Sequence, residues 1–186
     1  MTNEKNRVCP VEFANSLDNK IRRYLQNPRK ILKPFITEGM KVLDIGCGPG
    51  FFSIEIAQMV GSTGKVFAVD LQEGMLQKIR NKIKDTELEK RIELIKCESD
   101  KLIVPEKVDF IVAFYMVHEV PEKENLFSLL KNILDDNGKF LLVEPKLFHV
   151  SKKEFSTTLR IAEKTGFRIT EGPKLPFSFS ALLNKV

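Results

Sequence analysis

The chain is organised around the stretch Val42-Leu43-Asp44-Ile45-Gly46-Cys47-Gly48-Pro49-Gly50-Phe51-Phe52. Apolar residues on both sides of Asp44 predict a short buried strand, and the three glycines at alternate positions predict a tight turn. Residues 53–57 have helical character, so the segment is interpreted as a strand, a glycine turn and a helix. Such a turn lets a ligand approach the main chain, and the amino end of the helix suits an anionic group.

An acidic strand end follows shortly after this turn. Residues 66–69 are apolar and lead into Asp70, twenty residues after Gly50. An acid at the tip of the second strand is placed to accept hydrogen bonds from the hydroxyls of a ribose. The alternative is an acid in a solvated loop, but its position favours a ligand that contains a ribose.

The spacing of the glycines distinguishes two kinds of nucleotide-binding protein. The dinucleotide fingerprint requires glycine at its sixth position, which is Phe51 when counted from Gly46 and Ser53 when counted from Gly48. The D-x-G-x-G-x-G pattern that begins at Asp44 instead resembles motif I of the class I S-adenosylmethionine-dependent methyltransferases. Three alternatives stay open: a nucleotide-dependent oxidoreductase, a donor-binding regulator or partner subunit without catalysis, and a glycine turn that serves only as scaffold.

The resemblance extends over residues 41–186 and implies an enzyme of this family. S-adenosylmethionine would be the cofactor, S-adenosylhomocysteine the product, and the fold a Rossmann-like α/β sheet. The acceptor of the methyl group is not indicated by any motif, and a small molecule is the favoured class.

Composition agrees with a globular protein of one domain. The chain has 186 residues, of which 42% are hydrophobic and 30% charged, and we predict a single domain over 1–186. Residues 1–40 are expected to form a helical cap and residues 41–186 an α/β core. The net charge of +5 comes from lysines scattered among glutamates, which argues against a nucleic-acid partner.

Features that the sequence lacks indicate where the protein is located. The longest apolar run, residues 110–117, is too short to cross a membrane, and the polar first residues lack the apolar core of a signal peptide. The three cysteines, Cys9, Cys47 and Cys97, show no C-x-x-C spacing, so they predict reduced thiols and a cytoplasmic location. No metal site is expected, and the oligomeric state stays open.

The remaining elements follow from hydrophobic periodicity. We predict helices over residues 16–25, 28–38, 53–60, 73–83, 126–134 and 152–164. Strands are predicted from residue 41 to the glycine turn and over 65–69, 92–96, 108–114, 139–144, 167–169 and 177–183. Because strands and helices alternate, the fold class is α/β: a doubly wound, mostly parallel seven-stranded sheet with an antiparallel last strand and helices on both faces.

The resemblance assigns the amino-acid part of the donor to the glycine turn. Gly46, Cys47, Gly48 and Gly50 would approach the donor with their backbone. Asp44 would support this loop or meet the amino group of the donor, directly or through water. The ligand is expected beyond the carboxyl ends of the strands, where the strand order reverses.

The ribose and adenine parts would lie along the next two strand ends. By resemblance, Asp70 takes the ribose hydroxyls and Leu71 packs beside the adenine. Glu98 or Ser99 would meet the adenine edge, with Asp100 as the fallback. For Glu98, an acid on the surface at a strand end is an equally plain interpretation.

The acceptor side is expected after the fourth and fifth strands. Phe114 and Tyr115 would line the pocket near the methionine part of the donor. His118 is the candidate general base, because histidine titrates near neutral pH, and a structural hydrogen-bonding role is its alternative. His149 is interpreted as a surface histidine. The short connection over residues 145–151 predicts an open acceptor site.

Overall fold

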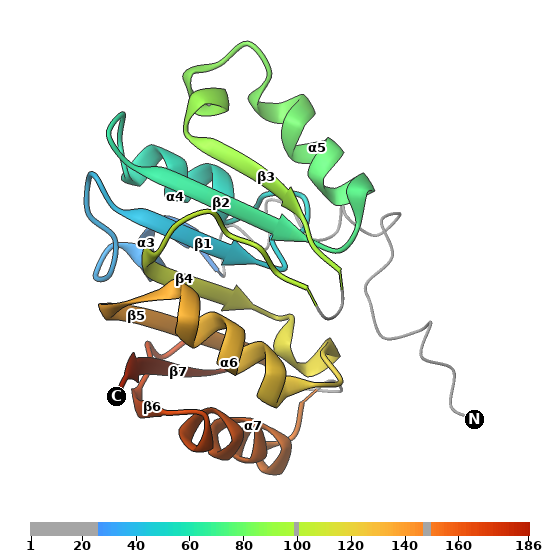
Figure 1. The fold of residues 1–186 in the computed structure, drawn as a ribbon, viewed down its shortest axis with the longest axis vertical. Coiled ribbons are helices and arrows are strands. Elements are labelled where there is room, and N and C mark those ends of the chain that lie inside the picture. Colours follow the sequence, from blue (N-terminus) through green and yellow to red (C-terminus); the bar gives the residue numbers. More distant parts are fainter. Residues whose placement is uncertain (1–25, 99–100, 147–149) are drawn as a thin grey trace.

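The protein is described from a computed structural model, which covers residues 26–98, 101–146 and 150–186 (Figure 1). The helix predicted over 16–25 lies outside these ranges. Within them, no helix combines the length and the apolar character that a membrane span requires.

Helices and strands alternate along the described chain. The helices are α3 (Pro28–Leu32), α4 (Ser53–Met59), α5 (Glu73–Ile83), α6 (Lys123–Ile133) and α7 (Lys152–Lys164), with short 3₁₀ turns η3 (Glu87–Lys90) and η4 (Val117–Glu119). The strands are β1 (Lys41–Ile45), β2 (Lys65–Asp70), β3 (Ile92–Lys96), β4 (Val108–Phe114), β5 (Leu134–Pro145), β6 (Phe167–Glu171) and β7 (Ser178–Lys185). Every predicted element in the described ranges is present.

The strands form one sheet in the order β3-β2-β1-β4-β5-β7-β6. The pairs that link β3, β2, β1, β4 and β5 are parallel, whereas β7 runs antiparallel to both β5 and β6. The order reverses between β1 and β4, which leaves a crevice at their carboxyl ends. In Figure 1 the parallel strands point to one edge of the molecule, and β7 begins at that edge. The predicted fold class is confirmed.

Side chains of the central strands alternate between two apolar cores. Val42 and Phe110 belong to the core that α3, α4 and α5 cover, whereas their neighbours Leu43 and Ile111 belong to the core beneath α6 and α7. Strands that are buried on both faces are nearly continuous in apolar residues, which is why 108–114 was recognisable as a central strand. The two layers of helices hold the carboxyl ends of the strands in fixed positions.

Helix α3 is shorter than the predicted 28–38. It ends at Leu32, although Lys33 keeps helical dihedral angles, because Pro34 has no backbone N–H to donate to a helical carbonyl. Phe35 and Ile36 continue in a tighter turn, in which both backbone N–H groups donate to the carbonyl of Leu32 at 2.8 and 3.0 Å. Ile36 is nevertheless buried, as its place in the apolar pattern suggests.

Strand β5 begins earlier than predicted. Residues 135–138 look like a glycine-terminated end of α6, but Gly138 does not have a positive φ. Instead the backbone enters the sheet at Leu134, which pairs with Val108, and a register shift separates this pair from Phe110 and Lys139. The extra residues are accommodated by this irregularity in the ladder.

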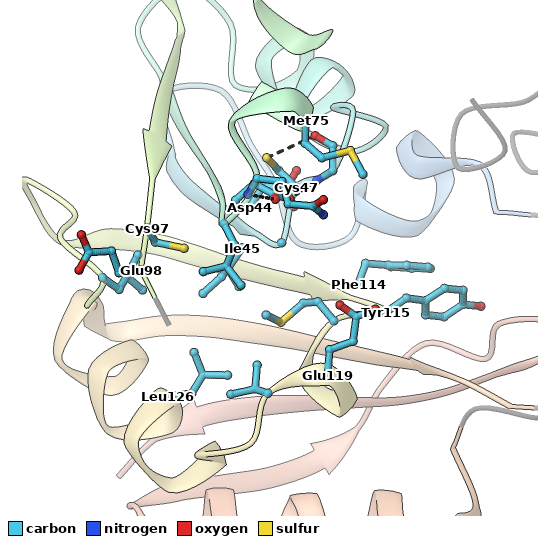
Figure 2. A pocket seen from close by; sticks show the side chains of 18 of the residues that line it. Asp44, Ile45, Cys47, Met75, Cys97, Glu98, Phe114, Tyr115, Glu119 and Leu126 are labelled. Carbon is cyan, nitrogen blue, oxygen red and sulfur yellow. Dashed lines mark hydrogen bonds between the residues drawn. The ribbon is translucent and has the colours of Figure 1, made fainter. Parts of the chain in front are cut away.

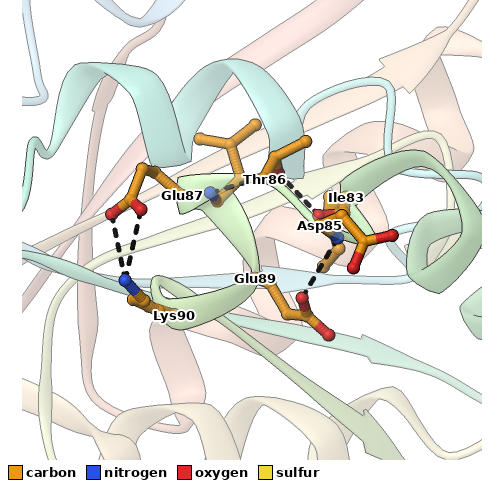
Figure 3. A network of polar contacts seen from close by, with 7 residues as sticks. Ile83, Asp85, Thr86, Glu87, Glu89 and Lys90 are labelled. Atoms are coloured by element: carbon orange, nitrogen blue, oxygen red, sulfur yellow. Dashed lines mark hydrogen bonds and ion pairs between the residues drawn. The ribbon is translucent and has the colours of Figure 1, made fainter.

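The connection from α5 to β3 is fixed by local hydrogen bonds (Figure 3). The hydroxyl of Thr86 donates to the carbonyl of Ile83 at 2.6 Å and accepts from the backbone N–H of Leu88 at 3.3 Å. Asp85, between them, has a φ of 59° and donates its backbone N–H to Glu89 at 3.3 Å. Helix α5 returns to the amino ends of the strands, so this turn lies at the edge opposite the crevice.

Candidate functional site

A pocket of about 480 Å³ occupies the crevice at the carboxyl ends of β1, β2, β3 and β4 (Figure 2). Its wall also includes η4 and the beginning of α6. The lining residues are Asp44, Ile45, Gly46, Cys47, Gly48, Pro49, Phe51, Phe52, Asp70, Leu71, Gln72, Met75, Cys97, Glu98, Lys101, Leu102, Phe114, Tyr115, Met116, Glu119, Val120, Pro121, Glu122, Asn125, Leu126 and Leu129. We call this the crevice pocket.

The glycine turn forms one side of the crevice pocket. Gly46 and Gly48 have φ values of 68° and 53°, in the left-handed region that favours glycine. The N–H groups of Gly46 and Cys47 both donate to the carbonyl of Val69, at 2.9 and 3.0 Å. A Cβ on Gly46 would lie 2.7 Å from the side chain of Met116, whereas a Cβ on Gly48 would meet nothing within 4 Å. The turn therefore has no room for a side chain at Gly46, where it packs against Met116, but it leaves space beside Gly48.

Gly50 differs from the other two glycines, because it does not line the crevice pocket. Its φ is 85°, and a Cβ there would lie 2.9 Å from Cγ1 of Ile79 on α5. Direct contact with a ligand was the prediction for Gly50, but its position is at a helix contact. It allows α5 to pack closely against the turn.

Asp70 ends β2 with its side chain beside the glycine turn. One carboxylate oxygen accepts the N–H of Gly48 at 2.9 Å, and the other accepts the N–H of Gln72 at 2.8 Å. Only 8% of the residue is exposed. Burial raises the pKa of Asp70, and these backbone hydrogen bonds oppose part of that rise. Asp70 thus links the turn after β1 to the turn after β2.

Asp44 supports the glycine turn from below. It is 2% exposed, and its carboxylate accepts a hydrogen bond of 2.5 Å from the hydroxyl of Ser53, the first residue of α4. Ser53 is itself fully buried. The contact ties the end of β1 to the beginning of the next helix across the turn.

Two cysteines lie on either side of Asp70. Burial, with the nearby charges of Asp44 and Asp70, raises the pKa of the Cys47 thiol well above its usual value. Burial and the charge of Asp70 raise the pKa of Cys97 to about 11. The raised pKa values favour the neutral thiol form, which is a weak nucleophile.

Aromatic rings form the opposite side of the crevice pocket. The rings of Phe52 and Phe114 lie 4.3 Å apart, and those of Phe114 and Tyr115 lie 4.5 Å apart. Tyr115 has a φ of 64°, which is uncommon for a bulky residue. Its hydroxyl lies 2.6 Å from the hydroxyl of Ser178 and 2.5 Å from the side-chain nitrogen of Gln26. These contacts join the end of β4 to the start of β7.

His118 lies outside the lining of the crevice pocket. It lines a second cavity, of about 780 Å³, between η4, α6 and α7. Its Nδ1 is 2.5 Å from one carboxylate oxygen of Glu144, and its backbone N–H donates to the other at 3.1 Å. Burial lowers the pKa of His118, but the hydrogen bond and charge of Glu144 outweigh this effect and the net shift is upward. Glu144 thus fixes the orientation of the imidazole, and the role of His118 as a general base stays a prediction.

Most of the site predicted from the sequence gathers around the crevice pocket. Asp44, Gly46, Cys47, Gly48, Asp70, Leu71, Glu98, Phe114 and Tyr115 line it. Ser99, Asp100 and His149 lie outside the described residues. That these side chains contact a cofactor stays a prediction.

Residues of α6 line the site although no pattern in the sequence predicted them there. Glu119, Glu122, Asn125, Leu126 and Leu129 line the crevice pocket from α6 and the turn before it. Their apolar members fit the pattern of a helix that packs on the sheet. The available signal was the position of Glu119, directly after the fourth strand.

Comparisons with known proteins agree with this geometry. A family model described as "Methyltransferase domain" matches residues 36–170. Ubiquinone/menaquinone biosynthesis C-methyltransferase UbiE of Escherichia fergusonii is 29% identical over 110 residues, which are 59% of this chain and 44% of that protein. UbiE of Salmonella arizonae is 26% identical over 138 residues, 72% of this chain and 55% of that protein. The chain thus spans about half the length of the curated relatives it matches.

Solved structures extend the likeness to the whole fold. A SAM-dependent methyltransferase from Aquifex aeolicus is 30% identical and superposes with a TM-score of 0.85, covering 96% of this chain and 100% of that one. The putative methyltransferase of Haloferax volcanii, solved with the Trm112 methyltransferase activator, is 13% identical with a TM-score of 0.76, covering 94% and 93%. The second likeness concerns the fold alone.

Proposed function

The chain belongs to the methyltransferase-domain family of S-adenosylmethionine-dependent enzymes, and from this premise we propose that it transfers the methyl group of S-adenosylmethionine to a small-molecule acceptor. The donor binds in the crevice pocket. The acceptor approaches from the side of Tyr115, which lines the pocket directly after β4.

The observation that carries the proposal is the position of the Asp70 carboxylate. Each of its oxygens accepts one backbone N–H, from Gly48 or Gln72, and a carboxylate oxygen can accept more than one hydrogen bond. The remaining acceptor capacity is suited to two neighbouring hydroxyls of a ribose. The turn between Gly46 and Gly48 leaves room for the amino-acid part of the donor beside it.

The charges around the pocket also suit this donor. S-adenosylmethionine carries a positive sulfonium. The lining includes the carboxylates of Asp44, Asp70, Glu98, Glu119 and Glu122 and one ammonium, that of Lys101. An acidic environment stabilises a cation, and its attraction is stronger where the carboxylates are buried, as those of Asp44 and Asp70 are.

Methyl transfer requires mainly that the protein align the acceptor with the methyl group and the sulfur of the donor. Bound S-adenosylmethionine supplies a methyl group on an activated sulfur, so the transfer is a displacement at carbon. Phe114 and Tyr115 form a rigid wall that excludes water and restricts the approach of the acceptor. A general base is needed only when the acceptor loses a proton. For His118 we favour a structural role, in which it supports the turn after β4.

The size of the acceptor is inferred from the relatives. The curated relatives are named for ubiquinone and menaquinone biosynthesis, which supports a small molecule. Only residues 146–151 separate β5 from α7, and this short connection agrees with an open acceptor side.

Calorimetric titration tests the donor assignment. The wild-type protein should bind S-adenosylmethionine and S-adenosylhomocysteine but not NAD. Asp70→Asn removes a charged acceptor and should weaken binding roughly 10- to 100-fold. Glu163→Gln, which changes an exposed acid on α7, is the matched control and should bind like the wild type. Binding of NAD alone, or equal binding by Asp70→Asn, would overturn the proposal.

A further inference from the structure

The turn that leads into β7 carries a phenylalanine where the backbone favours glycine. The N–H of Ser178 donates to the carbonyl of Leu175 at 3.4 Å, which closes a four-residue turn with Pro176 and Phe177 at its centre. Phe177 has a φ of 53°. Proline followed by a positive φ matches a type II turn, whose third position normally holds glycine or asparagine. A bulky residue there strains the backbone.

The phenyl ring receives little burial in return. Phe177 is 62% exposed, so packing against the protein does not explain why an aromatic residue occupies the position. A single exposed apolar residue is common on protein surfaces. The combination of an exposed apolar side chain with a strained backbone is uncommon. Such strain is concentrated at ligand-binding sites.

The turn is anchored to the candidate site on both sides. The hydroxyl of Ser178 lies 2.6 Å from that of Tyr115, whose side chain lines the crevice pocket. The carbonyl of Phe177 accepts the N–H of Lys146, directly after β5, at 2.8 Å. The backbone of Phe177 is therefore held beyond the carboxyl ends of β4 and β5, at the edge where an acceptor arrives.

We infer that Phe177 contacts the acceptor and determines its class: a planar aromatic small molecule that packs against the exposed ring. The inference rests on the proposed function, because it places the acceptor on the Tyr115 side of the donor. An exposed phenyl ring offers a flat apolar face, and ring–ring contacts favour aromatic partners over saturated ones. Strain in the turn is tolerated because the ring serves the substrate.

A second strained turn provides a matched control. Residues 83–86 form a similar turn, in which the N–H of Thr86 donates to the carbonyl of Ile83 at 3.0 Å and Asp85 has a φ of 59°. This turn follows α5, which runs back from the crevice to the amino ends of the strands, so it lies at the opposite edge of the sheet. Asp85→Gly and Phe177→Gly both replace a residue of positive φ with glycine, but only the second removes an exposed ring from the turn whose Ser178 contacts Tyr115.

The experiment measures binding of naphthol and of its saturated counterpart, decahydronaphthol, to protein saturated with S-adenosylhomocysteine. The wild type should prefer naphthol. Phe177→Gly and Phe177→Leu should weaken naphthol binding roughly 3- to 10-fold, whereas Phe177→Tyr and Asp85→Gly should not. Neither glycine variant should lower the melting temperature, and all should bind S-adenosylhomocysteine equally.

The outcomes separate the two proposals. If the protein does not bind S-adenosylhomocysteine, the proposed function fails. If it does, three results overturn the inference alone: no naphthol binding, equal affinity for naphthol and decahydronaphthol, or equal naphthol affinity of the wild type and Phe177→Leu. Loss of naphthol binding in Asp85→Gly as well would assign the effect to stability and would also overturn it.

Discussion

At the scale of single residues, the pair of His118 and Glu144 shows how a polar group is buried behind the site. Glu144 is 1% exposed, and both of its oxygens accept hydrogen bonds from His118, one from the ring and one from the backbone. A buried carboxylate is costly without such partners. The pair holds the turn between β4 and α6, which carries Glu119 into the crevice pocket.

This pair predicts a dependence of stability on pH. Because the pKa of His118 in the folded protein is raised above 6.5, its protonated form stabilises the folded state. That contribution is fully present below about pH 6.5 and is lost as the pH rises through the folded pKa. Melting temperatures of the wild type and Glu144→Gln, measured from about pH 6 to about pH 9, should converge as the pH rises. A difference that is constant or increases with pH would contradict this prediction.

Residue identities in the site were largely predictable, but their directions were not. Asp44 and Asp70 were identifiable because acids at strand ends have a distinctive position in the sequence. His118 was placed near the ligand because it follows the fourth strand and histidine titrates near neutral pH, whereas in the structure it lines the second cavity. The left-handed backbone of Tyr115 redirects the chain after β4, and no residue pattern indicates a positive φ at a tyrosine.

At the scale of elements, the contact between the glycine turn and α5 limits which substitutions the turn tolerates. Gly50→Ala would place a Cβ 2.9 Å from Ile79, which is fully buried, in a backbone region that alanine disfavours. The strain and the overpacking together should lower the free energy of unfolding by roughly 2–4 kcal/mol. Urea denaturation measures this value directly.

Gly48→Ala is the comparison for this prediction. A Cβ at Gly48 meets nothing within 4 Å, so only the backbone strain remains and the loss of stability should be smaller, about 1–2 kcal/mol. Gly48 lines the crevice pocket and Gly50 does not, so donor binding should weaken in folded Gly48→Ala. Equal destabilisation by the two substitutions would refute the assignment of Gly50 to helix packing.

Element boundaries were predictable where periodicity ends at a local signal. Helices α5 and α7 and strands β3 and β4 begin and end where hydrophobic spacing placed them. Helix α3 stops early, before Pro34, and this proline is a signal for helix termination that the sequence contains. The early start of β5 depends on pairing between Leu134 and Val108, a contact between segments that only the folded sheet brings together.

At the scale of the whole molecule, donor binding should stabilise the fold. The crevice pocket joins residues of β1, β2, β4, α5 and α6 and of the segment after β3, so a ligand there contacts both helix layers of the protein. With S-adenosylhomocysteine at about 100 times its Kd, linkage adds roughly 2.7 kcal/mol. For a chain of this size the melting temperature should rise by roughly 5–10 °C. Differential scanning fluorimetry should show this rise in the wild type and a smaller one, about 1–6 °C, in Asp70→Asn at the same concentration, because a 10- to 100-fold loss of affinity leaves the ligand at roughly 10 to 1 times the Kd of the variant.

The topology was predictable because right-handed crossovers and the reversal of strand order restrict the arrangements open to alternating strands and helices. The identity of the acceptor was not predictable, because no motif in the sequence marks the residues that would bind it. The donor side can be predicted from the sequence, because it is built from short consecutive motifs. The acceptor side is built from distant turns.

The place of β7 between β5 and β6 has a consequence for how the protein is made. A ribosome finishes β5 at Pro145 and reaches the end of β7 at Lys185 about 40 residues later, a delay of a few seconds at roughly 5–20 residues per second. During that time the nascent chain carries an apolar strand with one edge unpaired. Neighbouring nascent chains can pair with that edge, so the yield of folded protein depends on translation speed and crowding as well as on native stability.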